Sequence, residues 1–350
     1  MSRSHSRSRR CGWLAAPLLA ACSILPAHAA GPATIAFTGS LEVVTPPLDK
    51  QFGEVAGVAT NSQGHIFVFT RTGGDLTLGA ARAFTHGGSR LYEFDAGGKY
   101  LREIGVGLYG FLAAHAVRVD AQDNIWVVDE AAGMVIKFSP EGKVLMTLGR
   151  KPEAVPVPSL PAKHDDDGLG VPGDTFDGPA DVAWDAQGNI FVADGTGNAR
   201  IIKFAPDGTY IKAWGGRGSG QGQFNNLHTI ATDAAGNVYV GDRGNKRIQV
   251  FDNDGKFLRQ ITGIGDPAAI CITRGARPTL YSSNSGSPTD MDNGEIYRLD
   301  LTGKILGRFG SAGRTAGQFS SVHEIDCRDP GALLVAELGN WRVQKLTFGR

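Results

Sequence analysis

The chain has 350 residues, of which 41% are hydrophobic and 20% are charged, as in a folded globular protein with a core of its own. Its 49 glycines are far more than a helical protein tolerates and indicate many tight turns. The segment 1–30 holds four of the 35 Lys and Arg and no acid, so the segment 31–350 carries 31 bases against 35 acids, a net charge near −4. Nucleic acid is therefore not an expected partner, because binding its backbone requires a basic surface.

The N-terminal segment 1–30 predicts an export signal. "MSRSHSRSRR" is basic, "CGWLAAPLLAA" is apolar but too short to span a bilayer as a helix, and "AHA" (Ala27–Ala29) is typical of a cleavage site. "LAAC", which ends at Cys22, alternatively resembles a lipobox, and Arg9-Arg10 is a loose twin-arginine match. We expect a periplasmic or secreted protein, attached to a membrane only if Cys22 is lipidated.

The segment 31–350 predicts one domain of six repeats, without helical periodicity. Each repeat has an apolar strand, Asp-x-x-Gly/Asp-Asn, a second strand that ends on Asp, Arg-Ile-x-x-Phe, and a last strand after Gly. The template matches 115–149, 179–215 and 228–263 well, and 55–104, 267–310 and 323–350 loosely. Repeats of about 40–50 residues with four short strands are typical of β-propeller blades, whereas a solenoid would need capping repeats. The sequence therefore predicts an all-β, six-bladed propeller, in which Ala33–Val44 supplies the fourth strand of the last blade and closes the ring.

Two further features leave alternatives open. A Pro/Gly/Asp-rich insertion at 150–178 interrupts the repeats, and its "HDDDG" stretch could hold calcium, although acidic loops usually face water. After the signal only Cys271 and Cys327 remain, which could form one disulfide or stay as two buried thiols.

A histidine opens the innermost strand of every second repeat, at His115, His228 and His323. The acid that closes the next strand follows each histidine at the same interval, and these closing acids are Asp129, Asp242 and Glu337. The position of the histidines, which we call the slot, holds Ala56 in repeat one, Ala180 in repeat three, and Ala268 or Ala269 in repeat five. Alternate blades of a six-bladed ring lie 120° apart, so the three imidazoles should converge on the axis with an open fourth position, as in catalytic zinc or iron sites.

Two arginines, Arg71 and Arg243, stand directly after the position of the closing acid in their repeats. The second strand of an antiparallel hairpin returns to the start of the first, so both should lie at the mouth that carries the histidines. Guanidinium groups there would suit a carboxylate-bearing substrate, although surface salt bridges would also explain them. We interpret three other repeated pairs as structural: Asp194 with Arg200, Asp242 with Arg247, and Glu337 with Arg342.

"DAQGNIFVADGTGNARIIKF" and "DAAGNVYVGDRGNKRIQVF" resemble NHL repeats. With "GVATNSQGHIFVFTRTG" and the histidine-started strands, the segment 31–350 is similar to the peptidyl-α-hydroxyglycine α-amidating lyases, across all six repeats. The resemblance implies that His115, His228 and His323 bind zinc and that Arg71 and Arg243 are active-site arginines. It also implies a channel calcium held by the carbonyl groups of Val58 and Val117 and by Glu324, where the family has Asp.

The sequence departs from this family where protons are transferred. Thr196 stands where the family has a catalytic tyrosine, and a hydroxyl of much higher pKa cannot readily serve as an anionic base. Ser321 replaces a methionine near the third histidine, and Gly197 replaces a cysteine. The metal-binding and carboxylate-binding residues are kept, whereas the proton-transfer residue is missing.

Two functions follow from these patterns. The first is an exported metal-dependent lyase-like enzyme for a small carboxylate-bearing substrate with a hydroxyl or carbonyl group. The second is a non-catalytic propeller that binds a protein, peptide or glycan and uses the metal structurally, because a propeller does not by itself imply catalysis. In either case we expect a monomer.

Overall fold

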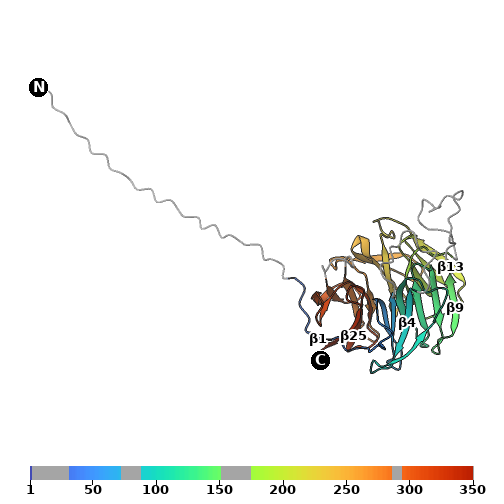
Figure 1. Cartoon of the computed structure of the whole chain (residues 1–350). Helices are drawn as coiled ribbons and strands as arrows, with labels where there is room; N and C mark the ends of the chain where they lie inside the picture. Colours follow the sequence, from blue (N-terminus) through green and yellow to red (C-terminus); the bar gives the residue numbers. More distant parts are fainter. Residues whose placement is uncertain (2–30, 72–87, 151–174, 286–293, 350) are drawn as a thin grey trace. The chain divides into compact units, whose positions relative to one another are not determined.

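The structure, a computed structural model, describes residues 1, 31–71, 88–150, 175–285 and 294–349 (Figure 1). The predicted export signal with Cys22 lies outside these residues, as does most of the 150–178 insertion with its HDDDG stretch. Pro32–Arg350 folds as one compact unit. Within the described part of the chain, no helix has the length and apolar character needed to cross a membrane.

Six four-stranded antiparallel sheets make up this unit, which confirms the six-bladed propeller. Blade one contains β2 (Glu54–Thr60), β3 (Ile66–Arg71), β4 (Ser89–Phe94) and β5 (Tyr100–Ile104), and blade two contains β6 (Ala114–Val119), β7 (Ile125–Asp129), β8 (Met134–Phe138) and β9 (Val144–Gly149). Blade three contains β10 (Pro179–Trp184), β11 (Ile190–Asp194), β12 (Arg200–Phe204) and β13 (Tyr210–Gly215), and blade four contains β14 (Leu227–Thr232), β15 (Val238–Asp242), β16 (Arg247–Phe251) and β17 (Phe257–Ile261), with a short 3-10 turn, η1 (Arg243–Asn245). Blade five contains β18 (Ile270–Ile272), β19 (Leu280–Asn284), β20 (Glu295–Leu299) and β21 (Ile305–Phe309), and a short parallel pair follows, β22 (Ser311–Ala312) with β23 (Gln318–Phe319). Blade six contains β24 (Val322–Asp326), β25 (Ala332–Glu337), β26 (Arg342–Phe348) and β1 (Phe37–Ser40).

The acid of each Asp-x-x-Gly/Asp-Asn stretch shapes the turn between the first two strands of a blade. In blade two, Asp120 Oδ1 accepts hydrogen bonds of 2.9 Å from the N–H groups of both Gln122 and Asn124. Asp233 does the same in blade four, where Ala235 and Asn237 donate. This local pairing satisfies the turn backbone and explains why the stretch recurs at the same point of several repeats.

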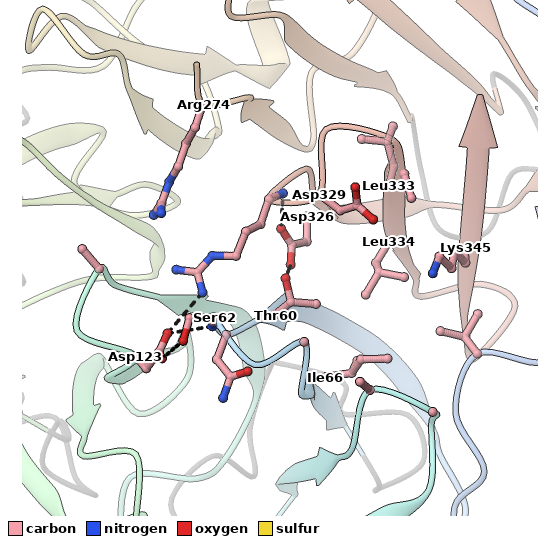
Figure 2. Close-up of a pocket in the computed structure, with 18 of the residues that line it drawn as sticks. Thr60, Ser62, Ile66, Asp123, Arg274, Asp326, Asp329, Leu333, Leu334 and Lys345 are labelled. Atoms are coloured by element: carbon pink, nitrogen blue, oxygen red, sulfur yellow. Dashed lines mark hydrogen bonds and ion pairs between the residues drawn. The ribbon is translucent and has the colours of Figure 1, made fainter. Parts of the chain in front are cut away.

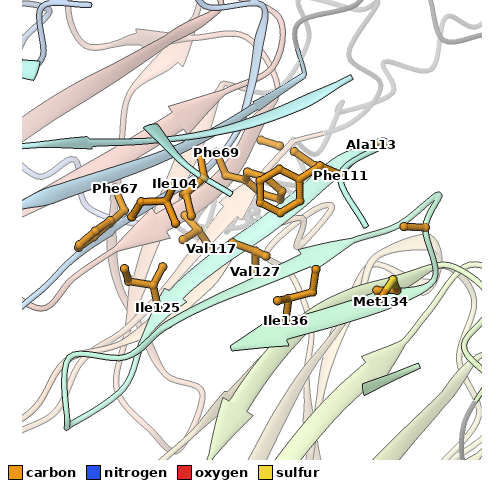
Figure 3. Packing of buried hydrophobic residues seen from close by; sticks show 14 of the residues in the cluster. Phe67, Phe69, Ile104, Phe111, Ala113, Val117, Ile125, Val127, Met134 and Ile136 are labelled. Carbon is orange, nitrogen blue, oxygen red and sulfur yellow. The ribbon is translucent and has the colours of Figure 1, made fainter. Parts of the chain in front are cut away.

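The blades are held together by apolar side chains packed between neighbouring sheets. Between blades one and two, Phe67 and Phe69 of β3 share one buried cluster with Val117 of β6 and Ile136 of β8 (Figure 3). A single blade would leave these faces exposed to water, so the sheets are stable only beside their neighbours. The packing fixes the position of each innermost strand relative to the next.

The N-terminal strand closes the ring as predicted, over a shorter length than Ala33–Val44. β1 pairs antiparallel with β26, from Phe37 opposite Phe348 to Ser40 opposite Lys345. This pairing is why the C-terminus lies beside β1 in Figure 1. A disulfide joins Cys271 in β18 to Cys327, directly after β24, and so links blades five and six. Of the two alternatives left open by the sequence, one disulfide or two buried thiols, the structure has the disulfide.

Candidate metal centre

The three histidines meet in space, although they come from three different blades. They lie in β6, β14 and β24, the innermost strands of blades two, four and six, and their ring centroids are 4.5–4.8 Å apart. Their candidate ligand nitrogens all lie within 4.8 Å of one another, and each residue is at most 7% exposed. The arrangement has the donor type and spacing of a three-histidine metal site.

Each slot coincides with a β-bulge. The register between the first two strands shifts at the slot residue in five blades, namely at Ala56, His115, Ala180, His228 and His323. A bulge places one extra residue on one strand and re-aims its side chain, which a regular ladder would keep on one face of the sheet. The bulges therefore account for the convergence of the imidazoles.

Backbone carbonyls of the alternate blades orient the imidazoles. His228 Nδ1 lies 2.7 Å from the carbonyl oxygen of Ala268, and His323 Nδ1 lies 2.8 Å from that of Ala56. A carbonyl only accepts, so Nδ1 carries the proton and Nε2 keeps the lone pair that a metal binds. For His115 the corresponding carbonyl is that of Ala180. This carbonyl acts to raise the pKa of His115, but its geometry to Nδ1 does not meet that of a full hydrogen bond. The slots of Ala268 and Ala56 thus each hold a histidine ring through a backbone carbonyl, in addition to leaving room for it.

The site keeps its histidines neutral. Burial, followed by the charge of Arg71, lowers the pKa of His115 to about 3. Burial also lowers the pKa of His228 and of His323 well below the ordinary value, and the proximity of His115 adds to this effect in both. Neutral imidazole is the form that binds metal, so the residues present fit a zinc or iron ion.

A cavity of about 220 Å³ opens beside the histidines, and both predicted arginines line it. Arg71 is held by the protein itself: its Nε donates a 2.7 Å hydrogen bond to the carbonyl of Ala114, and its Nη1 lies 3.4 Å from Glu54. Arg243 begins η1, and burial lowers the pKa of its guanidinium. Both arginines therefore line the same cavity, Arg71 at the end of β3 and Arg243 at the start of η1.

Glu130 is a cavity residue that the sequence analysis missed. Its Oε1 accepts a 3.1 Å hydrogen bond from Thr196 Oγ1, and its Oε2 lies 3.9 Å from Arg71 Nη2. Glu130 directly follows the closing acid Asp129, so it holds the repeat position that singled out Arg71 and Arg243. Examining that position in every repeat, rather than looking for arginines alone, would have identified it. Ser321 lines the same cavity, whereas Gly197 does not.

The residues of the predicted calcium site come together through other groups than expected. Glu324 Oε2 accepts hydrogen bonds from the amide N–H groups of Val58 (2.9 Å) and Val117 (3.1 Å). The prediction instead placed the carbonyl groups of these two residues around a cation, and an N–H group cannot be a cation ligand. Glu324 Oε1 lies 3.0 Å from Arg118 Nε, which already supplies a positive charge. Calcium at this position stays a prediction.

The repeated acid–arginine pairs are structural. Nitrogen-to-oxygen distances are 2.9 Å for Asp194 with Arg200, 2.7 Å for Asp242 with Arg247 and 2.8 Å for Glu337 with Arg342. Each acid also accepts a backbone N–H from the segment that enters its blade, donated by Asp177, Asn225 and Ser320 respectively. None of the six paired residues lines the histidine cavity.

A larger cavity of about 590 Å³ lies at the opposite ends of the innermost strands (Figure 2). Two of its acids are bonded to the protein: Asp326 accepts a 2.6 Å hydrogen bond from Thr60, and Asp123 pairs with Ser62 and with Arg328. We therefore keep this cavity apart from the candidate site.

The comparisons with known proteins agree with the repeats. Residues 176–204 and 224–251 match the NHL repeat family model. The protein is an NHL-repeat β-propeller. The propeller is 30% identical to human NHL repeat-containing protein 3 over 238 residues, which are 64% of this chain and 62% of that protein. It is 32% identical over 320 residues to mouse peptidyl-glycine alpha-amidating monooxygenase, covering 85% of this chain and 30% of that protein.

A third relative names a single activity. Peptidyl-alpha-hydroxyglycine alpha-amidating lyase 1 of Drosophila melanogaster is 28% identical over 267 residues, which are 67% of this chain and 44% of that protein. The chain thus spans less than two thirds of the length of each of these relatives. Among solved structures, a streptogramin B lyase superposes with a TM-score of 0.55 at 16% identity, covering 89% of this chain and 98% of that one, a likeness of fold alone.

Proposed function

We propose that this propeller is an exported metal-dependent lyase-like enzyme acting on a small carboxylate-bearing substrate with a hydroxyl or carbonyl group. One observation carries the proposal: three neutral, inward-facing histidines border a cavity that also contains Arg71, Arg243 and Glu130. Within the described residues the cluster offers three ligands and not four. Three ligands with adjacent space are the arrangement of catalytic rather than structural zinc.

The named activities of the relatives suggest the reaction. An α-hydroxyglycine unit would lose its C–N bond, releasing a carboxamide and glyoxylate. A zinc or iron ion bound by His115, His228 and His323 would supply Lewis-acid chemistry toward the substrate oxygen. We assign carboxylate binding to Arg243, which lines the cavity at the start of η1, because a guanidinium binds a carboxylate through two hydrogen bonds. Arg71 supports the metal site instead, since it holds the Ala114 carbonyl beside His115.

Export is part of the proposal. The Cys271–Cys327 disulfide supports it, because disulfides persist in secreted and periplasmic compartments and are rare in the cytosol. The basic, apolar and small-residue order of the N-terminal segment supports it independently.

The non-catalytic alternative remains a distinct candidate, since human NHL repeat-containing protein 3 carries no activity in its name. Elemental analysis of the purified protein and of a His115→Ala/His228→Ala double variant tests the metal site. We expect about one zinc or iron per chain in the wild type and none in the variant. The metal-loaded protein should then release glyoxylate from an N-acyl-α-hydroxyglycine. Metal retention without turnover would favour a structural metal, and no transition metal in either protein would refute the enzyme.

A further inference from the structure

Glu130 occupies the cavity where a proton must move. Among the described residues that line the cavity, the histidines are candidate metal ligands and the two arginines are cations. Asn226 offers a neutral amide, and Thr196 and Ser321 offer only hydroxyls, whose pKa lies far above neutrality. Glu130 is the carboxylate among them, and its side chain is 15% exposed. Its contacts with Thr196 and Arg71 fix both carboxylate oxygens relative to the cavity.

We propose that Glu130 transfers the proton in the reaction, a role that rests on the proposed function. In the lyase step the carboxylate of Glu130 takes the proton from the substrate hydroxyl, the C–O bond becomes a carbonyl, and the C–N bond breaks. The same proton passes from Glu130 to the departing amide nitrogen. The products are a carboxamide and glyoxylate, so no oxidant, reductant or second substrate is required. A positioned acid–base group of this kind contributes about 10²–10⁴-fold to a rate.

Glu54 provides the matched control, because it also pairs with Arg71, at 3.4 Å, but does not line the cavity. With metal-loaded protein and N-acetyl-α-hydroxyglycine, Glu130→Gln should lower kcat by about 10²–10⁴-fold, whereas Glu54→Gln should change it less than about threefold. Metal content and glyoxylate affinity, measured by elemental analysis and calorimetry, should be unchanged in Glu130→Gln.

The outcomes separate the two proposals. Turnover by Glu130→Gln within about threefold of wild type would overturn the role of Glu130 and leave the lyase function standing. Loss of metal or of glyoxylate binding in that variant would reassign Glu130 to positioning. Absence of turnover by the metal-loaded wild type would overturn the lyase function and the proton transfer together.

A different set of contacts carries a second inference, independent of catalysis. Just beyond the slots, Arg118 of blade two joins Asp181 of blade three and Glu324 of blade six. Its Nε and Nη2 lie 2.9 and 2.6 Å from the two oxygens of Asp181, and Nε lies 3.0 Å from Glu324 Oε1. Asp181 and Glu324 are at most 2% exposed. Blade one leaves room for this cluster at Gly57, where a Cβ would lie 2.5 Å from Glu324 Oε2.

We infer that the Arg118 guanidinium supplies the positive charge of this cluster and takes the place of a calcium ion. Two buried carboxylates require a compensating positive charge, and a bidentate guanidinium supplies it with directed hydrogen bonds. Glu324 Oε2 accepts hydrogen bonds from the amides of Val58 and Val117. Oε1 makes no hydrogen bond and lies 3.0 Å from Arg118 Nε, so the guanidinium already stands where a cation would contact this oxygen. The propeller should therefore fold and stay stable without calcium.

Thermal unfolding in EGTA and in millimolar Ca²⁺ tests this directly. The wild-type Tm should agree within about 1 °C between the two conditions, and Arg118→Ala should lower it by about 10 °C in EGTA because two buried charges lose their partner. Ca²⁺ should restore at least about half of that loss, since it can then enter the vacated space. Arg102→Ala, which removes an outer pair with Glu93 at 2.6 Å, is the control and should not respond to Ca²⁺.

A wild-type Tm that falls in EGTA, or stoichiometric calcium in purified wild-type protein, would overturn the inference even if Arg118→Ala does not fold. An Arg118→Ala protein as stable as wild type, or one that Ca²⁺ does not stabilise, would overturn it as well.

Discussion

Removing a single imidazole should change how the metal-free protein responds to acid. In the folded state the pKa of His115 is about 3, against 6.5 for a free imidazole, so the folded protein excludes a proton that the unfolded chain accepts. A histidine with a lowered pKa contributes its full stability above pH 6.5 and loses it as the pH falls toward 3. Between pH 7 and pH 5 the linkage relation gives about 2 kcal/mol for this one residue, because the unfolded imidazole becomes almost fully protonated while the folded one stays neutral.

The measurement is urea unfolding of metal-free wild type and His115→Gln at both pH values. The free energy of unfolding of the wild type should fall by about 2 kcal/mol more than that of the variant. Buried carboxylates such as Asp129 titrate in both proteins, so their contributions cancel in the difference. Equal pH dependence in the two proteins would refute the burial of a neutral His115.

Three further predictions concern Arg243, Arg71 and the disulfide. Arg243→Ala should weaken glyoxylate binding to the metal-loaded protein by about 10- to 100-fold, the worth of a charged hydrogen bond, as calorimetry would show. Arg71→Ala should instead reduce metal content, because it releases the Ala114 carbonyl beside His115; equal effects of the two variants on glyoxylate would contradict this division. Reduction of Cys271–Cys327, which closes a loop with a sequence separation of 56, should lower the free energy of unfolding by about 4 kcal/mol on the chain-entropy estimate. Urea unfolding with and without a reductant measures this loss, and identical midpoints would argue against a stabilising role.

Much of the fold could be predicted because repetition amplifies a weak signal. A single alternating strand is ambiguous, but six copies with the same turn residues and the same offsets are not. The strand that closes the ring was predicted for a similar reason, since one repeat was short by one strand. Its shorter extent, Phe37–Ser40, reflects pairing with β26 alone, while Ala33 and Ile35 bond Arg308 of blade five instead.

The candidate site was less predictable where it depends on the backbone. The convergence of the histidines could be predicted because they occupy the same position in alternate repeats. The β-bulges that direct their side chains could not, because the bulges occur at alanine as well as at histidine. Glu130 was missed because the search followed arginines rather than the position they share. Arg118 was missed because its importance depends on Asp181 and Glu324, which come from two other blades.

The acceptors that orient His228 and His323 are main-chain atoms of Ala268 and Ala56. No side-chain substitution at those alanines can delete a carbonyl oxygen, so these two acceptors are protected from point mutation as long as the bulges persist. The imidazoles and the side chain of Arg71 can each be lost in a single substitution, but these two carbonyl acceptors cannot. A propeller that had lost His228 and His323 would therefore still carry the two carbonyl acceptors that orient them.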